Sequence, residues 1–372
     1  MLTEINDSPL IKAIREAYHS GQEDEALEPL VLVDKDGNPI GRISRGDSVI
    51  FYDLRGEREI QLTQALTEKN NDFHHFSIED LDLNFVTMIE YHPSLRAKVA
   101  FPPQGAVKNT FGEVIASQGL ELVKIAESEK AIHLGFFMNG KQEITFPGEK
   151  RIIVPSPQDV SSYAEVPQMN AAGVTKEIIS RINSSKDGVV VINYANVDVV
   201  GHIEEREAVI KAVECVDEQL GKVIQAARDN KFTLVVTSDH GTVEEWNYPD
   251  GTINTGHTKN PVPFILADFF SSTGLNLKSE GELADVAPTL LDLLNIPAPP
   301  EMTGKSLLIN QDRNFTRKKI LLLILDGWGI RQEESGNLIA QARTPNFDFL
   351  WKKFPGALLK AAGEAVGMPS NT

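Results

Sequence analysis

Ile320-Leu321-Leu322-Leu323-Ile324-Leu325-Asp326-Gly327-Trp328-Gly329 joins six consecutive aliphatic residues to a carboxylate and a glycine-containing turn. The aliphatic run is far shorter than the ~20 residues that cross a bilayer, so it predicts a strand buried on both faces, as in a parallel sheet. The sites of open α/β sheets lie at the carboxyl ends of their strands. Asp326, which ends this run, is therefore a candidate functional residue.

Short aliphatic or β-branched runs of the same kind recur along the chain and alternate with segments of helical spacing. Apolar residues recur at helical intervals from 209 to 227, and a second helix is expected from about 285 to 294, with Pro288 in its first turn. This alternation predicts an α/β fold with a largely parallel sheet. The predicted strands are 49–52, 85–89, 132–137, 189–192, 233–237, 263–266 and 320–325.

The composition excludes several classes of partner. The chain has 372 residues, with 36 Lys and Arg against 53 Asp and Glu, which gives a net charge of −17. This acidity argues against a nucleic-acid partner or an anionic membrane surface, because both require clustered positive charge. The single cysteine, Cys215, and the lack of basic and apolar signal regions in the first seven residues predict a reducing, cytoplasmic setting.

Further potential metal ligands lie at or beside the ends of predicted strands. Asp198 and His202 follow one strand, and their four-residue spacing places both on one face if the segment is helical. Asp239 and His240 directly follow another strand, and His257 lies in a glycine-containing loop. Each residue alone has an ordinary alternative, because a strand-ending Asp often caps a helix and a lone His is usually a surface or core residue.

Together with Asp326, these residues favour a metal site. Mixed carboxylate and imidazole ligands favour Mn²⁺, Zn²⁺ or iron over Ca²⁺, which prefers oxygen alone. Six ligands are more than one such ion usually takes from a protein, so we expect two divalent ions. Two adjacent metal ions suit phosphoryl transfer, in which one activates a nucleophile while the other neutralises charge on the transferring group.

A phosphate-bearing substrate also requires cations. Arg55 and Arg58 follow the predicted strand 49–52 and could present bidentate donors from one strand end. Lys130 precedes the predicted strand 132–137 and could act as a point charge on a phosphoryl oxygen. The alternative is that all three are solvated surface residues.

Several further motifs accompany these ligands. They are GDSVIF (46–51), AFPP (100–103), VPSP (154–157), NPVPF (260–264), MTGKSL (302–307) and LDGWG (325–329). Together the motifs resemble those of the cofactor-independent (2,3-bisphosphoglycerate-independent) phosphoglycerate mutases of the alkaline phosphatase superfamily. The resemblance implies an alkaline-phosphatase-like domain, with helices on both faces of its sheet, and the remainder of a smaller α/β substrate domain.

The resemblance also implies site residues and a reaction. Family members use a metal-bound Ser to take the phosphoryl group from one hydroxyl of a phosphoglycerate and return it to the other, which interconverts 3-phosphoglycerate and 2-phosphoglycerate in glycolysis. By position in the motifs, Arg55 and Arg58 resemble the substrate-binding arginines, and Lys130 resembles the lysine beside the phosphoryl group. The implied ligands are Asp198, His202 and His257 for one Mn²⁺ and Asp239, His240 and Asp326 for the other.

The order of the motifs differs from that of the family. LDGWG opens the family's chain, whereas here it follows MTGKSL, so the order is circularly permuted. Residues 1–100 resemble the later part of the family's second, substrate-binding domain. Residues 101–372 resemble the metal-binding domain, with 311–319 as the connector of its two parts. Permutation of this kind can leave a packed core unchanged.

The family's nucleophile segment and the earlier part of its second domain are not found in this order. Ser370 and Thr372 are hydroxyl residues near the expected place, but they lie short of the motif. We therefore expect weak or no mutase activity from this chain alone, with the missing segment supplied by another chain or a longer gene product. Two alternatives are a metal-dependent phosphohydrolase, in which a metal-bound water replaces the Ser, and a non-catalytic metal-binding fragment.

Overall fold

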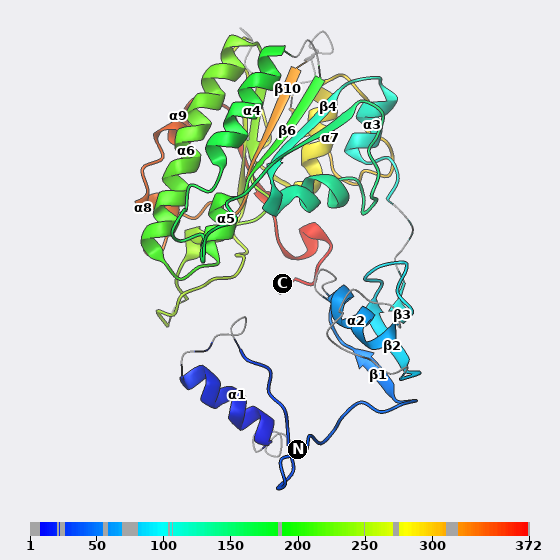
Figure 1. The fold of residues 1–372 in the computed structure, drawn as a ribbon. Coiled ribbons are helices and arrows are strands. Elements are labelled where there is room, and N and C mark those ends of the chain that lie inside the picture. Colours follow the sequence, from blue (N-terminus) through cyan, green and yellow to red (C-terminus); the bar gives the residue numbers. More distant parts are fainter. Residues whose placement is uncertain are drawn as a thin grey trace. The chain divides into compact units, whose positions relative to one another are not determined.

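The computed structural model divides the chain into two compact units, Met1–Gly105 and Ala106–Thr372 (Figure 1). The roles assigned to residues 1–100 and 101–372 remain predictions, and the predicted connector 311–319 lies outside the described residues except for its last residue. Within the described part of the chain, no helix is both long and apolar enough to cross a membrane. The described residues are 8–20, 22, 27–54, 59–68, 81–102, 105, 107–184, 188–248, 250–270, 275–309 and 319–370.

The larger unit is built around an eight-stranded sheet in the order β5-β4-β6-β10-β7-β8-β11-β9. The first five strands in this order run parallel, whereas β8 is antiparallel to both of its neighbours, so the predicted largely parallel sheet is confirmed. The strands are β4 (Leu122–Glu127), β5 (Glu149–Val154), β6 (Gly188–Tyr194), β7 (Thr233–Thr237), β8 (Val262–Ala267), β9 (Glu280–Glu282), β10 (Lys319–Leu325) and β11 (Gly356–Lys360).

Strand β10 lies in the middle of this sheet, between β6 and β7. Its register pairs Leu325 with Tyr194 of β6 and Ile324 with Thr237 of β7, so the three strands end at the same edge. Alternate residues of β10 face opposite sides of the sheet, because Leu321, Leu323 and Leu325 belong to one hydrophobic cluster while Ile320 and Leu322 belong to another. The strand is therefore buried on both faces, as its sequence predicts.

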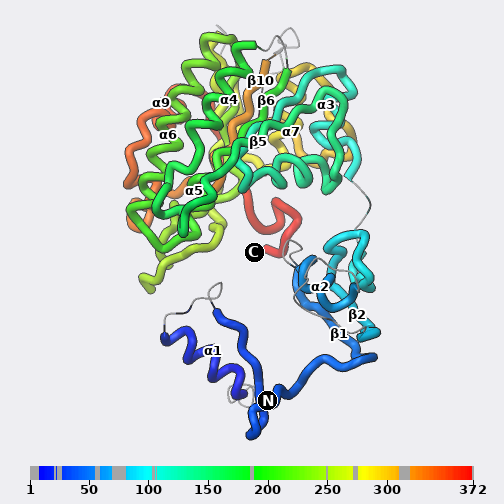
Figure 2. Tube along the Cα trace, in the orientation of Figure 1, coloured from blue at the N-terminus to red at the C-terminus, as the bar shows by residue number. Residues whose placement is uncertain are grey.

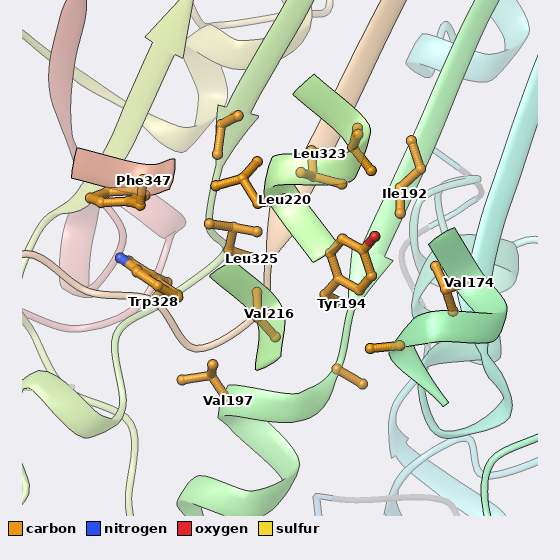
Figure 3. Close-up of a cluster of buried hydrophobic side chains, with 14 of the residues drawn as sticks. Val174, Ile192, Tyr194, Val197, Val216, Leu220, Leu323, Leu325, Trp328 and Phe347 are labelled. Atoms are coloured by element: carbon orange, nitrogen blue, oxygen red, sulfur yellow. The ribbon is translucent and has the colours of Figure 1, made fainter. Parts of the chain in front are cut away.

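Helices cover both faces of the sheet (Figures 1 and 2). On one face, Leu220 of α6 packs in the same cluster as Leu323 and Phe347 (Figure 3). On the other face, α3 and α7 contribute to the second cluster. The predicted helix 209–227 is found within α6, and α7 begins so that Pro288 lies in its first turn. The helices are α3 (Phe111–Ser117), α4 (Ala171–Ser184), α5 (Asn196–Gly201), α6 (Arg206–Asp229), α7 (Val286–Leu293), α8 (Leu338–Gln341) and α9 (Pro345–Lys353).

The predicted strand 132–137 is wrong. His133–Phe137 forms a π-helical turn, which follows a 3₁₀ turn at Ser128–Lys130. The Met138 amide donates to the His133 carbonyl at 3.0 Å, a bond between residues five apart that is typical of a π turn and not of a strand. A short apolar run does not by its spacing distinguish strand from helix. The strand of this region is β4, which the sequence analysis misses, and Lys130 therefore follows a strand instead of preceding one.

The smaller unit contains a separate three-stranded parallel sheet in the order β1-β2-β3. Phe85 and Thr87 of β2 are buried, and the ring of Phe51 contacts those of Phe85 and Tyr91 edge-on, at centroid distances of 6.0 and 5.7 Å. Ile50, which points to the opposite face, is 70% exposed. The elements of this unit are α1 (Pro9–His19), β1 (Ser48–Phe51), α2 (Glu59–Thr67), β2 (Asn84–Ile89) and β3 (Lys98–Phe101).

Candidate metal centre

The first ligand pair lies just beyond strand β6. Tyr194 ends the strand and α5 begins at Asn196, so Asp198 lies in the first helical turn, while His202 directly follows the last residue of the helix. The four-residue spacing places both side chains on one face, as predicted for a helical segment. As a result, the Nε2 atom of His202 lies 3.1 Å from Oδ1 of Asp198.

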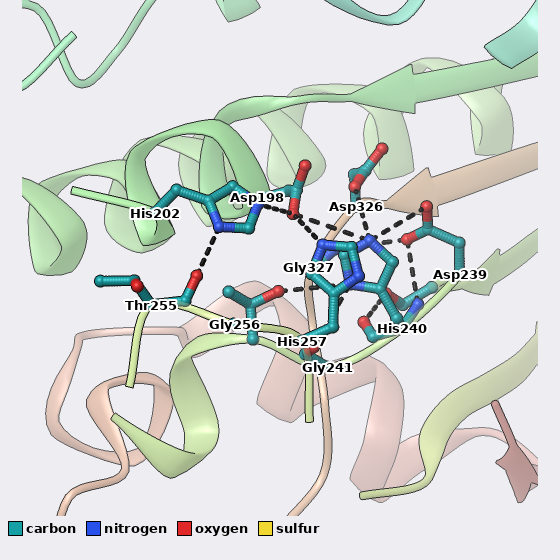
Figure 4. A network of polar contacts seen from close by, with 12 residues as sticks. Asp198, His202, Asp239, His240, Gly241, Thr255, Gly256, His257, Asp326 and Gly327 are labelled. Carbon is teal, nitrogen blue, oxygen red and sulfur yellow. Dashed lines mark hydrogen bonds and ion pairs between the residues drawn. The ribbon is translucent and has the colours of Figure 1, made fainter. Parts of the chain in front are cut away.

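Three imidazole rings converge on Asp198 Oδ1 (Figure 4). The Nε2 atoms of His202, His257 and His240 lie 3.1, 3.3 and 3.6 Å from this oxygen. The rings of His240 and His257 stack, with their centroids 3.6 Å apart and their planes 15° apart. His202 and His240 follow the parallel strands β6 and β7, and His257 lies in the loop before β8, so one edge of the sheet brings the three histidines together.

A second group of ligands shares Asp198 with the first. His240 Nε2 lies 3.6 Å from Asp326 Oδ1 and 3.6 Å from Asp239 Oδ2. In two sets of residues, all ligand atoms lie within 4.8 Å of one another: Asp198, His202 and His257, and Asp198, His240 and Asp326. The second set differs from the predicted ligands Asp239, His240 and Asp326, because it contains Asp198 instead of Asp239. Asp239 contacts His240 of this set without belonging to it. The assignment of Asp239 to an ion therefore stays a prediction.

Amide donors orient two of the carboxylates. Asn193 Nδ2 donates a hydrogen bond of 2.7 Å to Asp326 Oδ2, and the Gly327 amide donates one of 3.3 Å to Asp239 Oδ1. Asn193 is not among the residues that the sequence analysis selects, because an amide neither titrates nor ligates strongly. The signal that could have identified it is a buried polar residue placed directly after the aliphatic run of β6.

The ammonium group of Lys130 lies inside this cluster of carboxylates. Its Nζ atom is 2.6 Å from Asp198 Oδ2 and 3.0 Å from Asp326 Oδ1, and the side chain is buried. Burial lowers the pKa of Lys130, but the charges of Asp326 and Asp198 outweigh this effect and raise the pKa above its usual value. When Asp239 is included and all three carboxylates are ionised, they and the ammonium carry a net charge of −2, which would attract a divalent cation.

Burial affects the pKa values of Asp326 and Asp198 differently. Burial, reinforced by repulsion from Asp239, raises the pKa of Asp326 to about 7. Burial also acts to raise the pKa of Asp198, but its contacts with His202 and His257 outweigh this effect, so its pKa lies well below the usual range. A cation beside Asp326 would favour the ionised form of that carboxyl group.

The hydrogen-bond partners of the histidines fit a bound metal ion. His202 Nδ1 lies 2.5 Å from the Thr255 carbonyl and His240 Nδ1 lies 3.2 Å from the Gly241 carbonyl, so an N–H at Nδ1 of each ring would have a backbone acceptor. The Nε2 atoms of both rings face Asp198 Oδ1, at 3.1 Å for His202 and 3.6 Å for His240. Imidazoles oriented by backbone carbonyls in this way are typical of metal-binding histidines.

The remaining predicted site residues lie outside the described residues, except for Ser370. Arg55 and Arg58 lie outside the described residues, so their contacts with substrate stay predictions. Thr372 also lies outside the described residues, whereas Ser370 lies in an exposed turn near Gly363.

The sequence around this site matches the model of a known protein family. The model described as Metalloenzyme superfamily matches residues 36–298 and 318–372, which include all six predicted ligands. The chain belongs to the Metalloenzyme superfamily. In this superfamily member, the predicted ligands come from both matched segments, because Asp326 lies in the second and the other five lie in the first.

Curated relatives of this Metalloenzyme superfamily member are 2,3-bisphosphoglycerate-independent phosphoglycerate mutases. That of Moorella thermoacetica is 45% identical over 298 residues, and that of Listeria monocytogenes is 41% identical over 299 residues. A structure of Leishmania mexicana phosphoglycerate mutase at low cobalt concentration matches with a TM-score of 0.68 and 27% identity. Each match covers 80% of this chain but only 57% of the other protein. The matches confirm the resemblance and the fold inferred from the sequence.

Proposed function

We propose that this chain supplies the two-metal centre of a phosphoryl transfer that interconverts 3-phosphoglycerate and 2-phosphoglycerate. One observation carries the proposal: three imidazole Nε2 atoms converge on Asp198 Oδ1, beside Asp326 and Lys130. The similarity to the Moorella thermoacetica phosphoglycerate mutase supports the choice of substrate.

The proposed cofactors are two divalent cations, and Mn²⁺ suits the mixed carboxylate and imidazole donors. When bound, such ions neutralise charge on a transferring phosphoryl group. The proposed ligands are Asp198, His202 and His257 for one ion and Asp239, His240 and Asp326 for the other.

Lys130 is proposed to contact the phosphoryl group. An ammonium has three N–H donors, and the contacts with Asp198 and Asp326 use two of them. The third can donate to a phosphoryl oxygen, and the raised pKa keeps the group charged at neutral pH. Arg55 and Arg58 are proposed to bind the substrate, because guanidinium groups match the geometry of phosphate and carboxylate.

The proposal includes a segment beyond the matched residues. The chain spans 57% of the length of its curated relatives, so the nucleophilic hydroxyl and the rest of the substrate domain are assigned to a segment supplied by another chain or a longer gene product. Weak or no mutase activity is then expected from this chain alone. A cytoplasmic location is part of the same proposal, because the single Cys215 cannot form a disulfide within the chain.

The test combines calorimetric titration of Mn²⁺ with an assay of 3-phosphoglycerate conversion that follows both 2-phosphoglycerate and free phosphate. Two Mn²⁺ ions are expected per chain. Asp198→Ala removes a proposed ligand of one ion, so it should abolish binding of that ion. It should also weaken binding of the other ion, because Asp198 lies close to His240 and Asp326 as well. Asp229→Ala, which changes an exposed carboxylate on α6, is the matched control and should leave binding unchanged.

The outcomes separate the alternatives. Mn²⁺ binding without either product is the result expected of the chain alone, and addition of the unmatched part of the Moorella enzyme should then restore 2-phosphoglycerate formation. Formation of 2-phosphoglycerate by the chain alone would contradict the need for another segment. Phosphate release alone would indicate a hydrolase. Failure of the unaltered chain to bind Mn²⁺ would overturn the two-metal centre.

A further inference from the structure

Glu244 is a completely buried carboxylate close to the metal centre that none of the ligand sets uses. It lies in a 3₁₀ turn, Val243–Glu245, four residues after His240. Burying a carboxylate costs free energy unless hydrogen bonds satisfy its oxygens. The hydrogen-bond donors to Glu244 therefore show which parts of the chain the buried carboxylate holds together.

These donors come from two loops that carry predicted ligands. The Thr242 amide donates to Glu244 Oε2 at 2.9 Å, and Thr242 lies two residues after His240. The Thr258 hydroxyl and Asn260 Nδ2 donate to Glu244 Oε1, the latter at 3.1 Å, and Thr258 directly follows His257. The carboxylate thus joins the loop of His240 to the loop of His257.

The backbone supports the same junction. Gly241 and Thr258 form an isolated antiparallel bridge, in which the Thr258 amide donates to the Gly241 carbonyl at 2.9 Å. The Thr242 hydroxyl lies 3.2 Å from Nδ1 of His240, so the residue whose amide Glu244 accepts also contacts a predicted ligand. Movement of Glu244 would therefore change the orientation of the His240 ring.

A third ligand-bearing loop packs against the same carboxylate. Gly329 follows Asp326 by three residues, and a Cβ atom at Gly329 would overlap the Glu244 carboxyl group. A Cβ atom at Gly241 would overlap it from another direction. Glycine at both positions is what allows the carboxylate to lie between the loops that follow β7 and β10.

From these contacts we propose that Glu244 is a positioning residue for metal binding. It holds three loops in a fixed arrangement: the loop of Asp239 and His240, the loop of His257 and the loop of Asp326. The inference rests on the proposed metal centre. Glutamine cannot replace the carboxylate, because its NH₂ group would face at least one of the donors that Glu244 now accepts. Substitution should therefore loosen the ligand loops without removing a ligand.

The test is titration of the metal-free full chain with Co²⁺, followed by the visible absorption of the bound ion. Glu244→Gln should weaken Co²⁺ binding by roughly tenfold or more and alter the absorption bands, since groups that orient metal ligands typically contribute 10- to 100-fold in affinity. The matched control is Glu245→Gln. Glu245 is adjacent to Glu244 and partly exposed, and it accepts a hydrogen bond of 2.9 Å from Asn260. The Co²⁺ affinity of the Glu245→Gln variant should therefore stay within about twofold of that of the unaltered chain.

Thermal unfolding of the metal-free variants separates positioning from stability. A lower melting temperature for Glu244→Gln with unchanged Co²⁺ affinity and spectrum would overturn the inference. If Glu244→Gln does not fold, Thr258→Val decides, because it removes one donor while preserving side-chain shape: weaker Co²⁺ binding supports the inference, and unchanged binding overturns it. Failure of the unaltered chain to bind Co²⁺ would instead overturn the metal centre, and the positioning role with it.

Discussion

Strands β4, β6, β7 and β8 of the larger sheet are buried along their whole length, whereas the three strands of the smaller sheet bury only Phe85 and Thr87. Both sheets contain parallel pairs, and parallel sheets usually have both faces covered. The smaller sheet departs from this rule, since Ile50 on its outer face is 70% exposed. Burial on both faces is thus a property of one region and not of parallel pairing itself.

The difference in burial between the two sheets determines where charged groups interact strongly with one another. At the end of the larger sheet, Asp198, Asp326 and Lys130 are buried, and charges interact more strongly where water is excluded. On the outer face of the smaller sheet, Asn84 Nδ2 donates to Ser48 Oγ at 3.2 Å, and Lys98 Nζ donates to Asn84 Oδ1 at 2.7 Å. This second group is exposed, so its bonds compete with water.

The largest expected difference comes from truncating one aliphatic side chain in each sheet. Leu323→Ala should destabilise the larger unit by about 4 kcal/mol, because Leu323 is completely buried in β10 and its removal leaves a cavity. Ile50→Ala should change stability by less than about 0.5 kcal/mol.

Urea unfolding measures the first effect in isolation, since the three tryptophans of the chain all lie in the larger unit. Hydrogen exchange of β2 amides reports the second. A loss of protection in Ile50→Ala comparable to the effect of Leu323→Ala would remove the contrast between the two sheets.

A smaller loss of stability is expected at the contact between α9 and α6. Asp217 on α6 is buried and accepts hydrogen bonds from the amides of Asn346 and Phe347, at 3.1 and 2.7 Å, at the start of α9. Asp217→Ala should cost about 3 kcal/mol in urea unfolding, because buried donors lose a charged acceptor. The exposed neighbour Glu218, substituted by Ala, should cost about 0.5 kcal/mol or less. Equal costs would show that the α9 contact does not need this carboxylate.

The next prediction concerns pH. Glu127 ends β4 and is buried, its Oε1 atom accepts a hydrogen bond from the Asn170 amide, and burial raises its pKa to about 7 from a usual 4.5. The native state therefore retains a proton that the unfolded state loses. The resulting stability is complete below about pH 4.5 and is lost as the pH rises through 7.

Glu127→Gln removes this dependence, because its amide stays neutral. The variant should match the unaltered protein near pH 4 and exceed its unfolding free energy at pH 8 by about 3 kcal/mol, measured by urea unfolding at each pH. A constant difference between the two proteins across this range would contradict the assignment to Glu127.

The smallest effect is expected on the outer face of the smaller sheet. Asn84→Ala removes the exposed hydrogen bonds of Asn84 with Ser48 and Lys98. It should lower the stability of the smaller sheet by less than about 0.5 kcal/mol, measured by hydrogen exchange of the β2 amides. Thr87→Ala, on the buried face of the same strand, provides the comparison and should cost more. A larger effect of Asn84→Ala would show that the outer face is protected from water.

Much of the larger sheet and the neighbourhood of the ligands could be predicted from sequence, because strands β6, β7, β8 and β10 are continuous apolar runs. Strand β4 was missed because Lys124 interrupts its apolar pattern, and this lysine is buried against Glu149 at 3.2 Å. The region 132–137 was mistaken for a strand because spacing alone does not resolve a short apolar run. The sharing of Asp198 between two ligand sets depends on which strands are neighbours, and sequence spacing does not contain that information.

The central position of β10 has a consequence for synthesis of the chain. Its partners β6 and β7 end at Tyr194 and Thr237, but β10 begins only at Lys319, and the first two strands cannot pair with each other across its place. At about 5–20 residues per second, the ribosome leaves that gap open for on the order of ten seconds. The edges of β6 and β7 that flank the gap lack their native partner during this time, so they are open to pairing with strands of other chains.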